Sequence, residues 1–239
     1  MISEHIKIEK FADIGTGEPF VARTGLGLIE ILEATNFKNR KEINDGIFTI
    51  LFDGLMPAFL SLREIRKIES GKDEKIVINL QKHYINLFNH LWVAYKDRMP
   101  KVVGLIGFDI GFLFQNEKDF EEGTGGFLKK NEILSGIDYQ FINMLRDERK
   151  TWQNILAKIR NDYLEHKKLN QKEVERHFNL ETAEIIFNNC WQAVEEIMVV
   201  FLRTGLPLYA GIDIAEIPLE KRDLKNPKRF QFVSTKPTP

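Results

Sequence analysis

Hydrophobic residues recur at helical spacing over residues 41–70, with polar residues between them. Spacings of three and four positions predict an amphipathic helix that buries one face. The apolar positions are Ile43, Ile47, Ile50, Leu51, Leu55, Phe59, Leu62 and Ile65. Pro57 lacks a backbone donor and crowds the preceding turn, so we expect it to kink this stretch or to split it into two helices. The sequence GKDE at 71–74 predicts a turn that ends it.

A second helix is predicted over residues 76–98, and Pro100 follows it. Its apolar face carries Leu80, Tyr84, Leu87, Phe88, Leu91 and Tyr95.

Residues 99–137 lack a clear periodicity, and we expect them to form an excursion from the helical part of the chain. Glycines at 104, 107 and 111, followed by GTGG at 123–126, disfavour one regular helix. We therefore expect a short buried element around 102–114 and an exposed glycine loop after it. The loop lacks the Lys-Ser or Lys-Thr pair of a phosphate-binding P-loop.

Two further helical stretches are predicted in the second half of the chain. The first runs from Asp138 to about His166, with Ser135 as a candidate N-cap and an apolar stripe at a period of 3.6 residues. The stripe consists of Phe141, Leu145, Trp152, Leu156, Ile159 and Tyr163. Asn170 and Glu173 resemble a capping box that opens the next stretch.

That last stretch runs to about Thr204, with a break expected near Asn179 and a stop at Gly205 and Pro207. Its inward positions are predicted to be Ala183, Ile186, Phe187, Cys190, Val194, Ile197, Met198 and Phe201. Trp152 and Trp191 lie within the apolar stripes, so we interpret both as core residues rather than as platforms for base stacking.

The four stretches predict an all-α fold, an antiparallel up-and-down bundle over residues 41–210. Residues 1–40 would form an extension that packs on the bundle, and residues 211–239 an irregular tail. From Pro218 the tail holds six basic and two acidic residues with four prolines, so it is a solvated tail or a segment that contacts RNA. Short strands could form near Ile6–Phe11 and Leu206–Ile214.

Charge and composition limit the partners that the chain can have. The net charge of −1 gives no global field that would attract nucleic acid, so such a partner would require a local basic patch. The single cysteine, Cys190, excludes an internal disulfide and a cysteine-based zinc cluster, and its apolar neighbours favour a buried thiol. The N-terminus lacks signal-peptide features and residues 102–114 are too short to span a bilayer, so we expect a cytoplasmic protein.

The segment RNDYLEH, residues 160–166, carries the clearest chemical signature. His166 could act as a general acid or base on a ribose hydroxyl or leaving oxygen, and Arg160 could hold phosphate oxygens. Asn161 could orient either group, and no metal or cofactor would be needed. Six positions on an ideal helix place Arg160 and His166 about 120° apart. A shared site would therefore require local unwinding or a second subunit.

Arg160, Asn161 and His166 match the pattern Arg, polar residue, four free positions and His, and the segment resembles the HEPN domains, the higher-eukaryote and prokaryote nucleotide-binding domains. The resemblance implies a four-helix bundle that forms a homodimer with a composite cleft. It also implies metal-independent RNA cleavage, often by a toxin with an antitoxin partner or by a phage-defence effector. In these terms His166 would be the acid/base, Arg160 the phosphate-binding group and Asn161 the polar helper.

Several alternatives remain open at the level of sequence. The same bundle could bind a nucleotide, RNA or another protein without cleavage, and Arg160 and His166 could be ordinary surface residues of a charged helix end. Asp162 with His166, and Glu173 with His177, have the i,i+4 spacing of a carboxylate–histidine metal site, which would suit a metal-dependent hydrolase. His83 and His90 share a helix face but lie about 10 Å apart along it, too far to share one ion.

Overall fold

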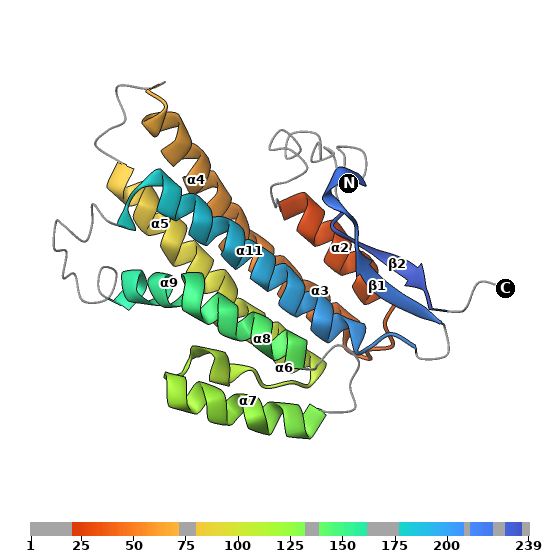
Figure 1. Ribbon diagram of the computed structural model, residues 1–239. Coiled ribbons are helices and arrows are strands. Elements are labelled where there is room, and N and C mark those ends of the chain that lie inside the picture. Colours follow the sequence, from red (N-terminus) through yellow and green to blue (C-terminus); the bar gives the residue numbers. More distant parts are fainter. Residues whose placement is uncertain are drawn as a thin grey trace.

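The computed structural model describes residues 21–71, 80–131, 139–161, 177–207, 211–221 and 228–235. Within these ranges the fold is an all-α helical bundle with one small antiparallel sheet, as Figure 1 shows. Nearly all of the predicted apolar positions that fall in these ranges are buried, including every predicted inward position between residues 183 and 201. The all-α prediction is therefore confirmed.

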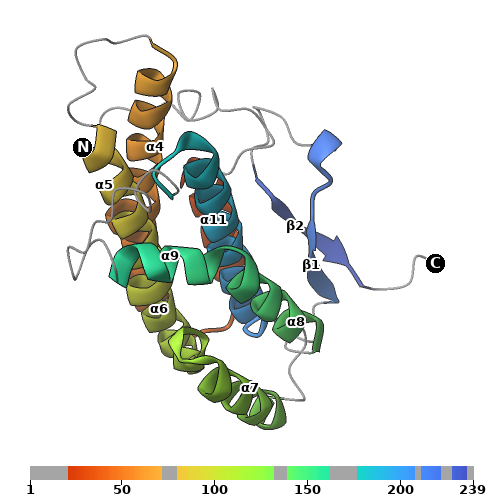
Figure 2. The same cartoon turned by 60° about the vertical axis from the view of Figure 1, so that its left-hand side comes forward.

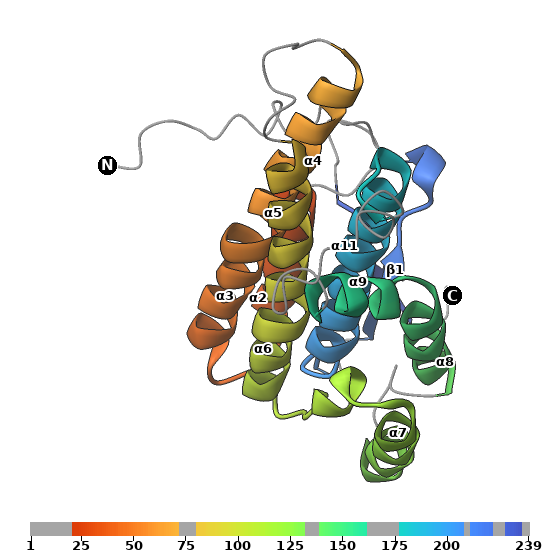
Figure 3. The same cartoon turned by 90° about the vertical axis from the view of Figure 1, so that its left-hand side faces the viewer.

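The first half of the bundle consists of two long antiparallel helical runs. One run contains α3 (Arg40–Thr49), the π-helical segment η2 (Ile50–Leu55) and α4 (Met56–Glu69). The other contains α5 (Leu80–Trp92), the π-helical segment η4 (Val93–Arg98) and α6 (Met99–Ile106). In these runs α4 packs on α5, η2 on η4 and α3 on α6 (Figure 3). The two wide π-helical segments therefore lie against each other.

Each π-helical segment is followed by a Met-Pro pair in the first turn of the next α-helix. A proline cannot donate to the carbonyl four residues earlier, and for Pro57 that carbonyl belongs to Asp53. The Nδ1 atom of His90 lies 3.1 Å from this oxygen and can replace the missing donor. The stretch before Pro57 is thus π-helical rather than α-helical, and α3 and α4 remain one continuous helical run. The prediction that the second helix ends before Pro100 is wrong, because α6 continues it to Ile106.

The contact between the two π-helical segments requires a glycine. A Cβ atom at Gly54 would lie 2.5 Å from the Cβ of Ala94, well inside van der Waals contact. The α4 helix ends at Glu69, and Gly71, the first residue of the predicted turn, has a φ of 67°. The other residues of that turn, 72–74, lie outside the described residues.

Residues 107–131 differ from the predicted loop-rich excursion. A short 3-10 turn, η5 (Gly111–Phe114), leads into α7 (Glu117–Asn131), so the GTGG sequence lies inside a helix. The predicted glycine loop is therefore wrong. A buried stripe of Phe120, Thr124 and Phe127 outweighs the cost of about 1 kcal/mol for each helical glycine. The helix lies along the outside of the bundle, at the end where α6 finishes (Figures 1 and 2).

The third helical stretch contains α8 (Tyr139–Glu148), a further π-helical segment η6 (Arg149–Gln153) and α9 (Asn154–Ile159). The last and longest helix is α11 (Leu180–Arg203), which runs through the core. The side chain of Asn179 caps it by accepting a hydrogen bond of 2.9 Å from the Thr182 amide, which explains the predicted break. Ser135 and the Asn170–Glu173 capping box lie outside the described residues.

The predicted irregular tail is wrong where the structure describes it. Strands β1 (Ile212–Glu216) and β2 (Phe230–Ser234) pair antiparallel, with Ile214 opposite Phe232, and the 3-10 turn η9 (Leu219–Lys221) follows β1. The sequences IDIAE and FQFVS alternate with a period of two, and Ile214, Phe230 and Phe232 pack against the core. The predicted strand near Leu206–Ile214 overlaps β1, and the one at Ile6–Phe11 lies outside the described residues.

A buried charge network joins this hairpin to α11 and to α2 (Val21–Glu33), which packs on α11. Glu195 is 1% exposed and accepts hydrogen bonds from the Arg23 guanidinium at 3.2 Å and the Arg229 guanidinium at 3.4 Å. The Thr24 hydroxyl lies 3.4 Å from the other carboxylate oxygen and accepts a 2.6 Å bond from the Trp191 indole. Segments distant in sequence are therefore fixed together by one buried carboxylate.

Two helical stretches are long and apolar enough to cross a bilayer, Arg40–Glu69 and Leu180–Arg203. Half of the apolar window of the first and 67% of that of the second are buried inside the protein. Core helices of globular proteins have the same character, so these helices are weak evidence for a membrane location.

Candidate functional site at the end of α9

Arg160 directly follows α9 and keeps helical backbone angles. Its amide donates to the carbonyls of Leu156 and Ala157, and π-helical geometry continues through Asn161. The buried residues Leu156 and Ile159 hold this last turn against the core. Arg160 is consequently half-buried in a defined position, whereas Asn161 is exposed to solvent.

Two cationic side chains lie over the ring system of Trp92, the last residue of α5. The guanidinium carbon of Arg160 lies 5.5 Å from the centre of the Trp92 ring system, and the ammonium of Lys96 lies 4.7 Å from it. Trp92 is only 5% exposed, so the ring acts as a rigid support. Cation–π contacts of this kind contribute about 0.5–2 kcal/mol each and position both charges.

Lys96 also lines a surface cavity of about 490 Å³ with Val93, Asp97, Arg98, Pro100 and Lys101. Arg98 donates to the Asp53 carboxylate at 2.9 Å. Lys96 and Lys101 have no acidic partner in the part of the chain that the structure describes. We call Lys96, Arg98, Lys101 and Arg160 the basic patch: Lys96, Arg98 and Lys101 line the cavity together with Asp97, and Arg160 is linked to them through the Trp92 ring that it shares with Lys96. Because Asp53 pairs with Arg98, the charge of this patch rests mainly on Lys96 and Lys101, with Arg160 beside them on Trp92.

The structure describes some of the predicted site residues but not all of them. Arg160 and Asn161 are described, and His166 lies outside the described residues, as do Asp162 and Glu173 of the alternative metal site. Of that metal site only His177 is described. Among the residues that the structure covers, no group of three His, Cys, Asp or Glu side chains is placed to hold a metal ion.

An acidic residue that sequence reasoning missed lies just before η6 on the same helical stretch. Burial and, to a smaller extent, the charges of Glu196 and Asp147 together raise the pKa of the Glu148 carboxyl to about 7. Its Oε2 atom is buried and has no hydrogen-bond partner in the described ranges. Tyr95 and Cys190 lie near it in the core, and burial raises the pKa of both. The neutral thiol of Cys190 confirms the prediction of a buried structural cysteine.

Comparison with known protein families, with curated proteins and with solved structures found no match.

Some of these residues could have been found from the sequence. Trp92 and Lys96 have the i,i+4 spacing of neighbours on a helix, and Trp92 precedes a run of charged residues. Glu148 gives no such signal, because it lies within the charged sequence RDERK and is buried only through the packing of η6 on α11.

Proposed function

We propose that this protein binds RNA at the basic patch and cleaves it without a metal ion. The observation that carries the proposal is the position of Arg160 over the ring of Trp92, which also holds Lys96. Lys96 in turn lines a cavity with Arg98 and Lys101. Phosphate contacts supply most of the affinity for nucleic acid, and a planar guanidinium suits phosphate oxygens. A near-neutral protein that concentrates cations at one place can attract RNA to that place.

In this proposal three residues of the RNDYLEH segment have distinct tasks. Arg160 binds the scissile phosphate and stabilises the charge that develops on it. His166 exchanges protons with the ribose 2′-hydroxyl and the leaving 5′-oxygen, and Asn161 orients one of these groups. A homodimer would complete the cleft, in agreement with the resemblance to HEPN domains, and a toxin or phage-defence role in the cytoplasm would follow from it.

Cleavage of bulk RNA by the purified protein in the presence of EDTA tests the catalytic part. We expect cleavage that disappears in His166→Ala and falls in Arg160→Ala, whereas Arg63→Ala, an exposed arginine on α4, retains full activity. Cleavage that requires a divalent metal, or that survives His166→Ala, would contradict the proposed chemistry.

The packing of Arg160 on Trp92 also favours a second function, a binding module that holds RNA or a nucleotide without cutting it. This support for Arg160 does not depend on His166. Fluorescence anisotropy with a labelled single-stranded RNA separates the two functions. For either one, Lys96→Ala and Lys101→Ala should each reduce the slope of log affinity against log salt by about 1. Lys129→Ala on α7 should not change it, and binding without turnover at any protein concentration would leave only the binding module.

A further inference from the structure

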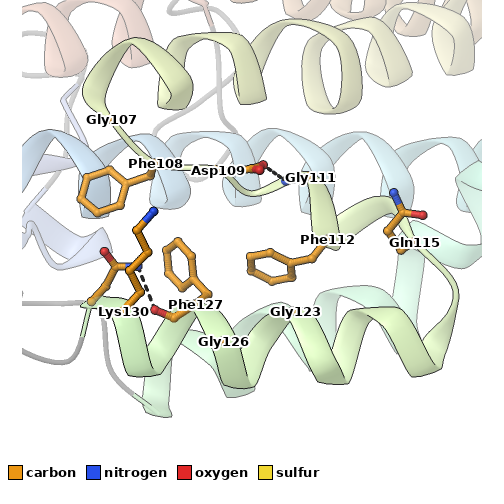
Figure 4. A pocket seen from close by; sticks show the side chains of 11 residues that line it. Gly107, Phe108, Asp109, Gly111, Phe112, Gln115, Gly123, Gly126, Phe127 and Lys130 are labelled. Atoms are coloured by element: carbon orange, nitrogen blue, oxygen red, sulfur yellow. Dashed lines mark hydrogen bonds between the residues drawn. The ribbon is translucent and has the colours of Figure 1, made fainter.

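A second cavity, of about 450 Å³, lies between residues 107–115 and α7 (Figure 4). Its size is typical of sites for small molecules, which usually measure about 300–1,000 Å³. None of the basic-patch residues lines it. The lining combines phenylalanines and glycines with a few polar side chains, which is the usual composition of a small-molecule site.

The aromatic part of the lining comes from Phe108, Phe112 and Phe127. Phe127 lies between the other two, with ring centroids 6.3 Å from Phe108 and 5.4 Å from Phe112. Phe108 and Phe112 remain partly exposed although they are aromatic, so their faces are accessible from the cavity. At Gly126 a Cβ atom would meet nothing within 4 Å, so open space lies beside the α7 backbone. Phe112 packs directly on α7 at Gly123, where a Cβ atom would lie 2.4 Å from the Phe112 Cβ. The room for a flat ring therefore lies on the open side of the phenyl groups, beside Gly126.

The polar part of the lining comprises a cation and an anion. In Figure 4 the ammonium of Lys130 extends toward the space beside Phe108 and Phe127, and it has no ion pair in the part of the chain described. Asp109 uses Oδ1 to accept a 2.8 Å hydrogen bond from the Gly111 amide, which fixes the carboxylate and leaves its second oxygen for another donor. A ligand that carries both an anionic group and N–H donors complements this arrangement.

The cavity has a rigid frame on the side of η6. The Arg149 guanidinium donates to the carbonyls of Leu113 at 3.2 Å and Gln115 at 2.6 Å, and it bonds Glu117 at 2.9 Å. Gln153 donates to the same Leu113 carbonyl at 2.7 Å. The turn that carries Phe112 is thus fixed before any ligand arrives, which lowers the entropic cost of binding.

We propose that this cavity binds a nucleoside monophosphate whose base carries an amino group. The base lies against the phenyl rings, where aromatic stacking and burial hold it. The phosphate meets Lys130, and the exocyclic amine donates to Asp109. This site is distinct from the proposed RNA site at Arg160.

Isothermal titration calorimetry with AMP, adenosine and UMP tests the proposal. We expect AMP to bind with a dissociation constant of roughly 0.1 mM, as suits a half-open site with few polar contacts. Adenosine, which lacks the phosphate, and UMP, which lacks the amine, should each bind about tenfold more weakly.

Two pairs of variants locate the site. Gly126→Leu places a side chain in the cavity and should abolish AMP binding, whereas Gly125→Leu meets nothing within 4 Å but does not line the cavity, so it should leave the affinity unchanged. Lys130→Ala should weaken AMP but not adenosine, and Lys129→Ala should affect neither. Leucine at either glycine favours the helix, so both proteins should fold.

Two results would overturn the proposal. One is the absence of AMP binding at concentrations up to roughly 10 mM, a hundred times the expected dissociation constant. The other is binding that persists in Gly126→Leu but is lost in Arg160→Ala, which would assign the nucleotide to the basic patch. RNA cleavage in EDTA is measured separately, so failure of the AMP site leaves the ribonuclease proposal untouched.

Discussion

Replacement of Glu148 by glutamine tests whether a buried acid makes the stability of this protein depend on pH near neutrality. Glutamine has nearly the same shape as glutamate but cannot ionise. The pKa of the folded-state carboxyl is about 7, compared with an ordinary value of 4.5. The folded protein therefore retains a proton that the unfolded chain releases between these two values, and the stability falls as the pH rises from about 4.5 to 7.

The size of this effect follows from the difference between the two pKa values. At about 1.36 kcal/mol per pKa unit, it corresponds to roughly 3 kcal/mol. Glu148 is only partly enclosed, so solvent screens its charge and we expect about 2 kcal/mol. In Glu148→Gln the stability does not fall in this pH range, because glutamine cannot ionise. The variant should therefore gain about 2 kcal/mol relative to the original protein between pH 5 and pH 8.

Urea unfolding followed by circular dichroism, at a series of pH values from about 4.5 to 8.5, measures this difference. Asp45→Asn is the control, because Asp45 is an exposed helical carboxylate and its loss should give a curve parallel to that of the original protein. Equal pH dependence in Glu148→Gln and the original protein would refute the reasoning. It would mean that Glu148 is solvated and ionises normally.

Three other substitutions test the packing. Gly54→Ala should destabilise the fold by about 1–3 kcal/mol in urea unfolding, because the new methyl group meets Ala94, whereas Gly27→Ala has open space and should be neutral or stabilising. Arg149→Ala removes the side-chain donor to the Gln115 carbonyl and leaves the Leu113 carbonyl with Gln153 alone, so hydrogen exchange should accelerate across residues 111–131, and unchanged exchange would contradict this role. Glu195→Gln removes the buried carboxylate that faces Arg23, while Arg229 keeps Glu196 and Glu216, and it should cost about 3 kcal/mol in urea unfolding, whereas a loss below about 1 kcal/mol would show that the network is solvated.

The periodicity of apolar residues was sufficient to predict the bundle, because burial of a continuous stripe dominates the energy of a helix in a protein. It was less reliable where rules about single residues compete with burial. The glycines of α7 were read as a loop, although Phe120 and Phe127 bury a face of the same segment. Pro100 was read as a helix end, although the π-helical turns before it accommodate the ring.

The candidate site was less accessible to prediction than the fold. The sequence identified Arg160 and Asn161 as one short motif, but it gave no indication that Trp92 supports Arg160 from a helix almost seventy positions earlier. Such contacts depend on the packing of α5 against α9, which no local pattern encodes. The strand β2 was missed, and β1 was predicted only in part, for a similar reason, since each is short and is stabilised by pairing with the other.

The matched π-helical segments have a consequence for how this chain can change in length. A π-helical turn corresponds to one additional residue in an α-helix, and here two antiparallel helices each carry one at the same level. Deletion of one residue from η2 alone would rotate all of α4 by about 100° relative to α3 and turn buried positions such as Leu62 outward. Deletions in η2 and η4 together would shorten both helices equally. Lineages that descend from this chain should therefore keep or lose the two segments as a pair.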